Sequence, residues 1–143
     1  MKSLILCGCV SILGLSSVAA IADDEPTTCS LATLHGTYAY AGVYFRFGAP
    51  VGASGMEFYD GHGKIKTYDQ GSDGMTSFTS QSTGTYTITP NCIATVIYDG
   101  DTANPHTYFV APDGNVFYYN NNNNHGRVSG GHEDRISRSS LVP

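Results

Sequence analysis

The residues of this sequence that could do chemistry are mostly acidic side chains and imidazoles, and many of them fall in turns. The densest group is His125 with His132, Glu133 and Asp134. On an extended strand the side chains of His132 and Asp134 share one face, so both could reach one ion. Their spacing matches no established metal motif, and the favoured interpretation is a solvated strand end. We therefore predict neither a metal site nor a cofactor.

Glu57 is the exception among the carboxylates, because it lies inside a predicted strand, between Met56 and Phe58. If its face points inward, it is a carboxylate in an aromatic cavity, and desolvation would raise its pKa. If its face points outward, it is an ordinary surface charge. The outward placement is favoured, because strands of a half-exposed sheet commonly carry their charges outside.

Nucleophilic catalysis finds little support in the sequence. No Gly-x-Ser-x-Gly elbow is present. Cys29 and Cys92 are the two cysteines that lie beyond the apolar leader, and in an exported protein such a pair predicts a disulfide. The bond would remove both thiols from any catalytic role, and catalytic residues stay unknown.

The first 22 residues have the pattern of a secretory signal peptide: Lys2, an apolar run from Leu4 to Leu15, and small residues ending in Ala20-Ile21-Ala22. Loss of Lys2 with this segment would change the formal net charge of −5 to −6. An acidic chain with scattered Lys and Arg residues is a poor partner for nucleic acid or for anionic membranes. We expect a secreted protein, extracellular or periplasmic, with no membrane association after signal cleavage.

Short runs of β-branched and aromatic residues, separated by turn residues, fill the rest of the chain. About eight strands are expected, with no segment of helical period, and the short connections favour an all-β, antiparallel, up-and-down barrel. We predict a flexible acidic lead-in at 23–30, the barrel domain at 31–136 and a loose tail at 137–143. Residues 71–82 are polar and are expected to form a long loop that could cover one mouth.

Aromatic side chains are the candidates for a ligand cavity, because Tyr offers apolar area with a polar tip. Period-two alternation along the strands, together with the turn positions, gives the inward or core positions that we predict. With Glu57 added for the case of an inward carboxylate, the candidates are Tyr38, Tyr40, Glu57, Tyr86 and Phe109.

Several of these segments resemble short exported proteins of the calycin-like, allene-oxide-cyclase-like barrel type. The similarity lies in Leu34-His-Gly-Thr-Tyr-Ala-Tyr40, in the Asp60-Gly-x-Gly63 turn, in the segment from Gly84 to Cys92, and in Pro112-Asp-Gly114. The resemblance implies an eight-stranded barrel with an apolar cavity. It also implies packing of Tyr38 against Arg135, in the place of the Trp–Arg pair of lipocalins. No catalytic motif of a cyclase is matched.

These observations favour a binding or interaction module for a small apolar or aromatic ligand. Two alternatives remain open: an isomerase or cyclase of the allene oxide cyclase type, and a secreted effector or structural protein without a cavity. Whether the protein is an enzyme, what its ligand is and how it assembles are not decided by the sequence. An inward Glu57 would favour chemistry, and an outward one would favour binding alone.

Overall fold

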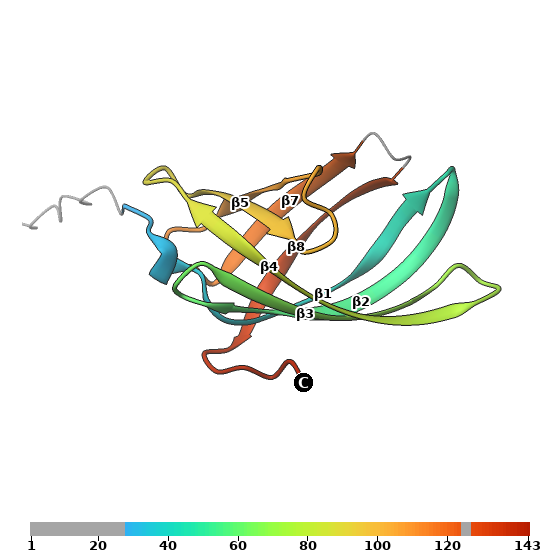
Figure 1. Ribbon diagram of the computed structural model, residues 1–143, viewed down its shortest axis with the longest axis horizontal. Coiled ribbons are helices and arrows are strands. Elements are labelled where there is room, and N and C mark those ends of the chain that lie inside the picture. The colour runs from blue at the N-terminus through green and yellow to red at the C-terminus, as the bar shows by residue number, and fades with distance from the viewer. Residues whose placement is uncertain (1–27, 124–126) are drawn as a thin grey trace, which may run out of the picture.

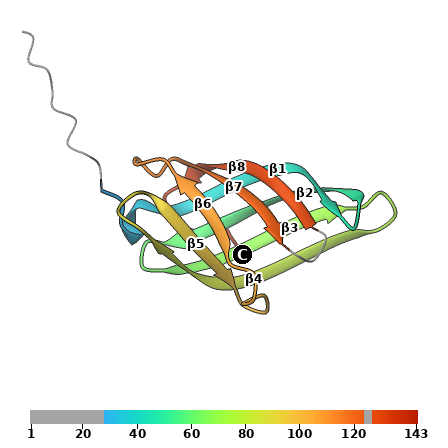
Figure 2. The same ribbon diagram turned by 90° about the horizontal axis from the view of Figure 1, so that it is seen from above.

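Eight antiparallel strands close into one up-and-down barrel, as the sequence predicts (Figures 1 and 2). The computed structural model describes residues 28–123 and 127–143, and for residues 121–123 and 127 only the backbone is described. A short 3-10 helix precedes the strands. The elements are η1 (Leu31–Thr33), β1 (His35–Arg46), β2 (Ala49–Asp60), β3 (Lys64–Ser72), β4 (Ser77–Ile88), β5 (Ile93–Tyr98), β6 (His106–Val110), β7 (Val116–Asn123) and β8 (Arg127–Ser137). The predicted signal peptide, residues 1–22, lies outside the described residues.

The barrel closes through pairing of β1 with β8, but this seam is paired only near its ends. Ala39 pairs with Asp134 and Phe45 pairs with Val128, while the β8 register gives no ladder pair for residues 40–43, all described. The same residues pair without interruption with β2 on their other side.

The β1–β2 and β3–β4 hairpins are long and reach beyond the shorter β5 and β6 (Figure 1). Residues 71–82 belong mostly to these strands, so the prediction of a long loop over one mouth is wrong. Only residues 73–76 form the turn, where the Asp73 carboxylate accepts backbone hydrogen bonds from Met75 and Thr76 at 2.9 and 2.8 Å. The register pairs Gly71 with Phe78, which extends the ladder through a glycine-containing segment.

An aromatic core fills the end of the barrel nearest η1. Tyr38, Tyr59 and Phe117 are fully buried, with ring centroids 5.1 to 5.7 Å apart. Tyr86 packs edge-on against Tyr59, and its hydroxyl lies 2.9 and 2.8 Å from the carbonyl oxygens of Leu31 and Leu34. The η1 segment therefore acts as a plug that the core holds in place.

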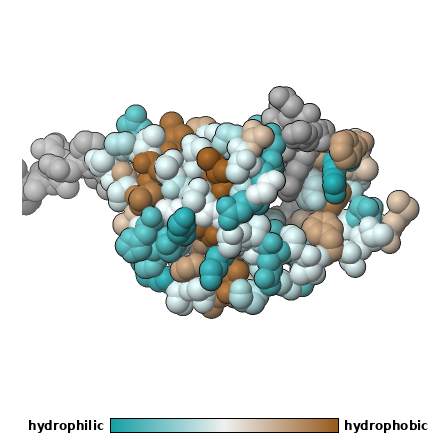
Figure 3. All heavy atoms as spheres, viewed as in Figure 1, coloured by the Kyte–Doolittle hydropathy of each residue, from teal (hydrophilic) through white to brown (hydrophobic). Residues whose placement is uncertain are grey.

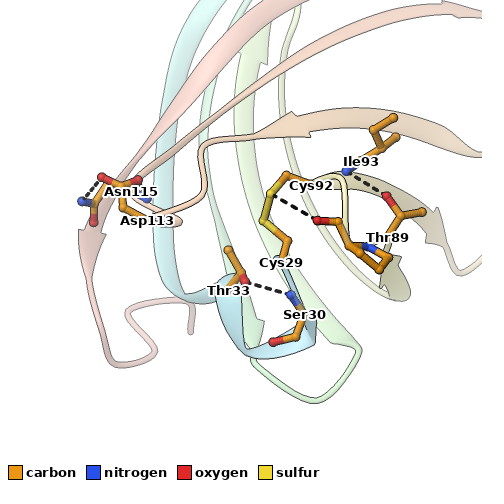
Figure 4. The surroundings of a disulfide bond; sticks show 9 residues. Cys29, Ser30, Thr33, Thr89, Cys92, Ile93, Asp113 and Asn115 are labelled. Atoms are coloured by element: carbon orange, nitrogen blue, oxygen red, sulfur yellow. Dashed lines mark hydrogen bonds between the residues drawn. A yellow bond between two sulfur atoms is a disulfide. The ribbon is translucent and has the colours of Figure 1, made fainter. Parts of the chain in front are cut away.

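The predicted disulfide between Cys29 and Cys92 is present and fastens this plug to the start of β5 (Figure 4). The Cys29 amide also donates to the carbonyl oxygen of Pro90 at 3.1 Å. Cys92 has a φ of 62°, in the left-handed region, at the end of the turn that joins β4 to β5. The covalent bond and the turn thus hold one end of the barrel shut.

The C-terminal segment after β8, expected to be loose, is hydrogen-bonded to β1. The Thr37 hydroxyl donates to the carbonyl oxygen of Ser139 at 2.7 Å and accepts from the amide of Leu141 at 3.0 Å.

On the outer face in view, apolar residues are scattered among polar ones rather than gathered over one strand pair (Figure 3). Within the described part of the chain, no helix is long and apolar enough to cross a membrane.

Candidate functional site

Glu57 points into the barrel, so the favoured outward placement is wrong. On β2 the residues of odd number face inward, and Val51, Glu57 and Tyr59 are all buried. The register pairs Glu57 with Tyr38 on one side and with Thr67 on the other, and both are buried. The sequence argument assumed a half-exposed sheet, whereas in a closed barrel this face of β2 points toward the interior.

Three tyrosines surround the Glu57 carboxyl group. Its Oε2 accepts a hydrogen bond from the Tyr59 hydroxyl at 2.6 Å, and its Oε1 accepts one from the Tyr98 hydroxyl at 2.5 Å. The Tyr98 and Tyr108 hydroxyls lie 2.8 Å apart, which extends the chain of phenols. Burial raises the pKa of Glu57 to about 7; the two phenol hydrogen bonds oppose the increase, and the charge of Asp69 adds to it.

Asp69 forms a second acidic position nearer the open end. Its Oδ1 accepts from the Tyr40 hydroxyl at 2.7 Å and its Oδ2 from the Ser80 hydroxyl at 3.3 Å. Gly55 lies between Tyr40 and Asp69 in the ladder and makes their contact possible. A Cβ at Gly55 would lie 2.5 Å from the Asp69 Oδ1 and 2.8 Å from the Tyr40 ring.

Glu133 is the third carboxyl group of the interior, and only 2% of its surface is exposed. Its Oε2 is buried without a hydrogen-bond partner, as is the hydroxyl oxygen of Ser129 on the same face of β8. Burial raises the pKa of Glu133 well above its ordinary value, and the charges of Glu57 and Asp69 raise it further. Leaving a buried polar atom unpaired costs about 1–3 kcal/mol, so this atom is set up to accept a partner.

These groups line a cavity of about 310 Å³ in the half of the barrel away from η1. Its wall carries five carboxyl groups and no Lys or Arg among the described residues. The middle of the β1–β8 seam borders it, through residues 41–44 on β1 and 129–131 on β8. The carboxyl groups are those of Glu57, Asp69, Asp99, Asp101 and Glu133.

The aromatic residues predicted from the sequence separate into three locations. Tyr38 and Tyr86 are buried in the closed core and do not border the cavity, while Tyr40 lines it. Phe109 is 55% exposed on the outer face, so its predicted inward position is wrong. Both Tyr108 and Phe109 are aromatic, so hydropathy gave no means of telling the inner face from the outer, and Tyr108 is the inward one.

Glu133 and Asp69 were not predicted as cavity residues, although β8 carried a usable signal. Packing of Arg135 against Tyr38 was expected, and the guanidinium lies 6.0 Å from the centroid of that ring. Residues two apart on a strand share a face, so an inward Arg135 implies an inward Glu133. For Asp69 the sequence offered no comparable partner, because its contact with Tyr40 depends on strand register.

The histidine group at the chain's end does not form a metal site in the described residues. His132 and Asp134 share the outer face of β8, with 3.5 Å between the imidazole Nε2 and the carboxylate Oδ2. His125 lies outside the described residues. Where the chain is described, no group of three or more His, Cys, Asp or Glu residues is placed to hold a metal ion.

Comparison of the chain with protein-family models, with curated proteins and with solved structures gives no match. The eight-stranded barrel and its disulfide are therefore established by the geometry, while membership of the calycin-like family stays a prediction.

Proposed function

We propose that this barrel binds a small organic molecule in its open half. The observation that carries the proposal is a cavity of about 310 Å³ whose wall includes buried, unpaired polar oxygens. This volume lies at the lower end of the range of roughly 300–1,000 Å³ for small-molecule sites. The other half of the barrel is filled by aromatic rings, which supports a division of the barrel into a packed structural half and a ligand-binding half.

The cavity's size and its wall limit the kind of ligand. At the packing density of about 0.75 found in protein interiors, the contents would occupy roughly 230 Å³, on the order of a dozen non-hydrogen atoms. Tyr40, Tyr108 and Tyr119 offer ring surface, whereas Glu57 and Glu133 require polar partners. A molecule with an aromatic or apolar body and one polar group suits this wall better than a molecule with no polar group.

Acid–base catalysis is the second candidate, and the inward Glu57 favours it. A carboxyl group with a pKa of about 7 can both donate and accept a proton near neutral pH. The hydroxyl groups of Tyr98 and Tyr108 lie beside it, and a phenol turned toward a substrate oxygen would stabilise the negative charge that develops there. An isomerase or cyclase can work with this acid–base group and these phenols. Conversion of a bound compound by the wild type, and loss of that conversion in Glu57→Gln, would identify such an enzyme.

The same proposal places the protein outside the cytoplasm. Support comes from the signal-peptide pattern of residues 1–22 and from a disulfide that needs an oxidising compartment.

The test is ligand discovery combined with a variant that fills the cavity. Protein purified from its own host is examined by native mass spectrometry, and a library of small organic compounds is screened for increases in melting temperature. Gly42 borders the cavity, and a Cβ built there meets no atom within 4 Å, so the side chain of Gly42→Leu begins in open space and adds volume at the cavity wall. We expect binding by the wild type and a loss of at least about tenfold in affinity for Gly42→Leu.

Gly52→Leu is the matched control. Gly52 does not border the cavity, and the nearest atom to its added Cβ is a carbonyl oxygen 4.0 Å away. Its affinity should equal that of the wild type. A folded protein that retains no compound and responds to none would favour an effector or structural role that does not use the cavity.

A further inference from the structure

We propose that the cavity binds the ammonium group of a small organic amine at Glu133, in a wall that also carries Asp69 and Glu57. The inference rests on the proposed function, because it specifies the chemistry of the ligand in the same cavity.

The charge of the wall is the first observation. Five carboxyl groups border the cavity, and no Lys or Arg among the described residues does so. Carboxylates taken out of water need a cation or several donors near them, and here the protein supplies phenols and hydroxyls but no fixed cation. An ammonium ligand would supply the missing positive charge.

Glu133 is the second observation, and it indicates where the ammonium group would lie. Its Oε2 is buried and has no hydrogen-bond partner, and neither has the Ser129 hydroxyl oxygen four residues earlier on the same strand. Glu57 and Asp69, in contrast, already accept hydrogen bonds from tyrosine hydroxyls. An ammonium group has three N–H donors, so one that bonds to Glu133 leaves two for other acceptors of the cavity wall.

The other ionisable groups that line the cavity with Glu133 include no Lys or Arg among the described residues. Among them are the carboxyl groups of Glu57 and Asp69, the imidazole of His106 and the phenols of Tyr40, Tyr108 and Tyr119. Burial raises the pKa of Glu133 well above its ordinary value and so disfavours its charged form in the empty cavity. An ammonium group beside Glu133 favours the charged form of this carboxyl group, so a proton that it holds passes to solvent and a carboxylate–ammonium pair forms, with no covalent change.

A metal ion would satisfy the charge but not the geometry. The described residues contain no group of three or more potential ligands arranged for one ion. The acidic groups instead line a chamber that also offers tyrosine rings, whose faces attract organic cations. The arrangement fits a cation with a carbon body better than a bare ion.

Matched amine and alcohol pairs test the inference by isothermal titration calorimetry. The pairs are phenethylamine with 2-phenylethanol, cyclohexylmethylamine with cyclohexylmethanol, and pentylamine with pentanol. We expect at least one amine to bind more than about tenfold tighter than its alcohol. Titrations at neutral pH in phosphate and in Tris, which differ in ionisation enthalpy, should show net proton release when the amine binds.

Glu133→Gln keeps the shape of the side chain and removes its charge. This variant should lose about tenfold in affinity for the amine and should release fewer protons than the wild type, while its affinity for the alcohol stays unchanged. Asp134→Asn is the control, because the neighbouring carboxylate is on the outer face of β8 with 67% of its side chain exposed. If Glu133→Gln fails to fold, Asp69→Asn is expected to show the same loss of preference for the amine.

The outcomes separate the inference from the proposal beneath it. Binding of alcohols as tightly as amines, or full amine affinity in folded Glu133→Gln, would overturn the ammonium site and leave a ligand-binding barrel in place. Failure of every amine and alcohol to bind would overturn the ammonium site, and the library screen would then decide the proposed function by itself.

Discussion

Gly55 shows how one missing side chain shapes the cavity wall. A Cβ at this position would lie 2.5 Å from the Asp69 Oδ1 and 2.7 Å from the carbonyl oxygen of Tyr68, which belongs to the backbone of β3. We expect Gly55→Ala to lower the free energy of unfolding by about 1–3 kcal/mol, because the strand pair or the Tyr40–Asp69 contact must move. Urea titration measures the loss.

Gly52→Ala on the same strand is the control for Gly55→Ala. Its added Cβ would lie 4.0 Å from the nearest atom, the carbonyl oxygen of Ser72, which is an ordinary contact. We expect a change within about 0.5 kcal/mol. Equal stability of the two variants would show that the Tyr40–Asp69 side of the cavity is more adaptable than its geometry indicates.

At the scale of elements, the plug formed by η1 depends on the disulfide. The bond joins residues 63 positions apart, and in the chain-entropy model it stabilises the fold by about 4 kcal/mol. The double variant Cys29→Ala/Cys92→Ala should lose free energy of unfolding of that order in urea titrations. Reducing agent should produce the same loss in the wild type and no further change in the variant.

Ligand affinity gives this prediction a second measurement. The disulfide is at the end of the barrel that the aromatic core fills, and neither cysteine borders the cavity. The folded double variant should therefore keep the affinity of the wild type for any cavity ligand. A loss of both stability and affinity would mean that the structure of the cavity depends on the position of η1.

The elements were largely predictable because their signals are local. Turn residues such as Asp60-Gly61-His62-Gly63 mark the hairpin between β2 and β3, and the Asp60 carboxylate accepts from the amides of His62 and Lys64 as turn chemistry requires. The outer part of the β3–β4 hairpin escaped prediction because residues 77–82 are polar apart from Phe78. A strand without hydropathic alternation is recognised only by its partner, here the residues of β3 from Thr67 to Ser72.

The cavity was less predictable, because its members come together through register and closure. Glu57, Tyr98 and Glu133 belong to three different strands, and nothing local to any of them encodes their distance from one another. Closure also decides which face is inside: the inward position of Glu57 follows from a closed barrel, and its outward placement follows from an open sheet. The site is therefore a property of the whole molecule rather than of a motif.

At this largest scale, the buried carboxyl groups make the stability of the barrel depend on pH. Burial raises the pKa of Glu57 from its ordinary 4.5 to about 7, and it raises that of Glu133 in the same direction. Between these two values the folded state binds more protons than the unfolded state. The contribution of these carboxyl groups to the free energy of unfolding is therefore fully present below about pH 4.5 and is lost as the pH rises through about 7.

The melting temperature should accordingly fall as the pH rises across this window, which differential scanning calorimetry can follow. Glu57→Gln should flatten the fall, and the double variant with Glu133→Gln should flatten it further, since each removes one group that must ionise inside the barrel. Asp134→Asn, which changes an exposed carboxylate, should keep the slope of the wild type. A slope that is the same in all four proteins would mean that water reaches Glu57 and Glu133 freely. In that case the cavity would be a wet channel through the open half of the barrel, and its carboxyl groups would already be ionised before any ligand arrived.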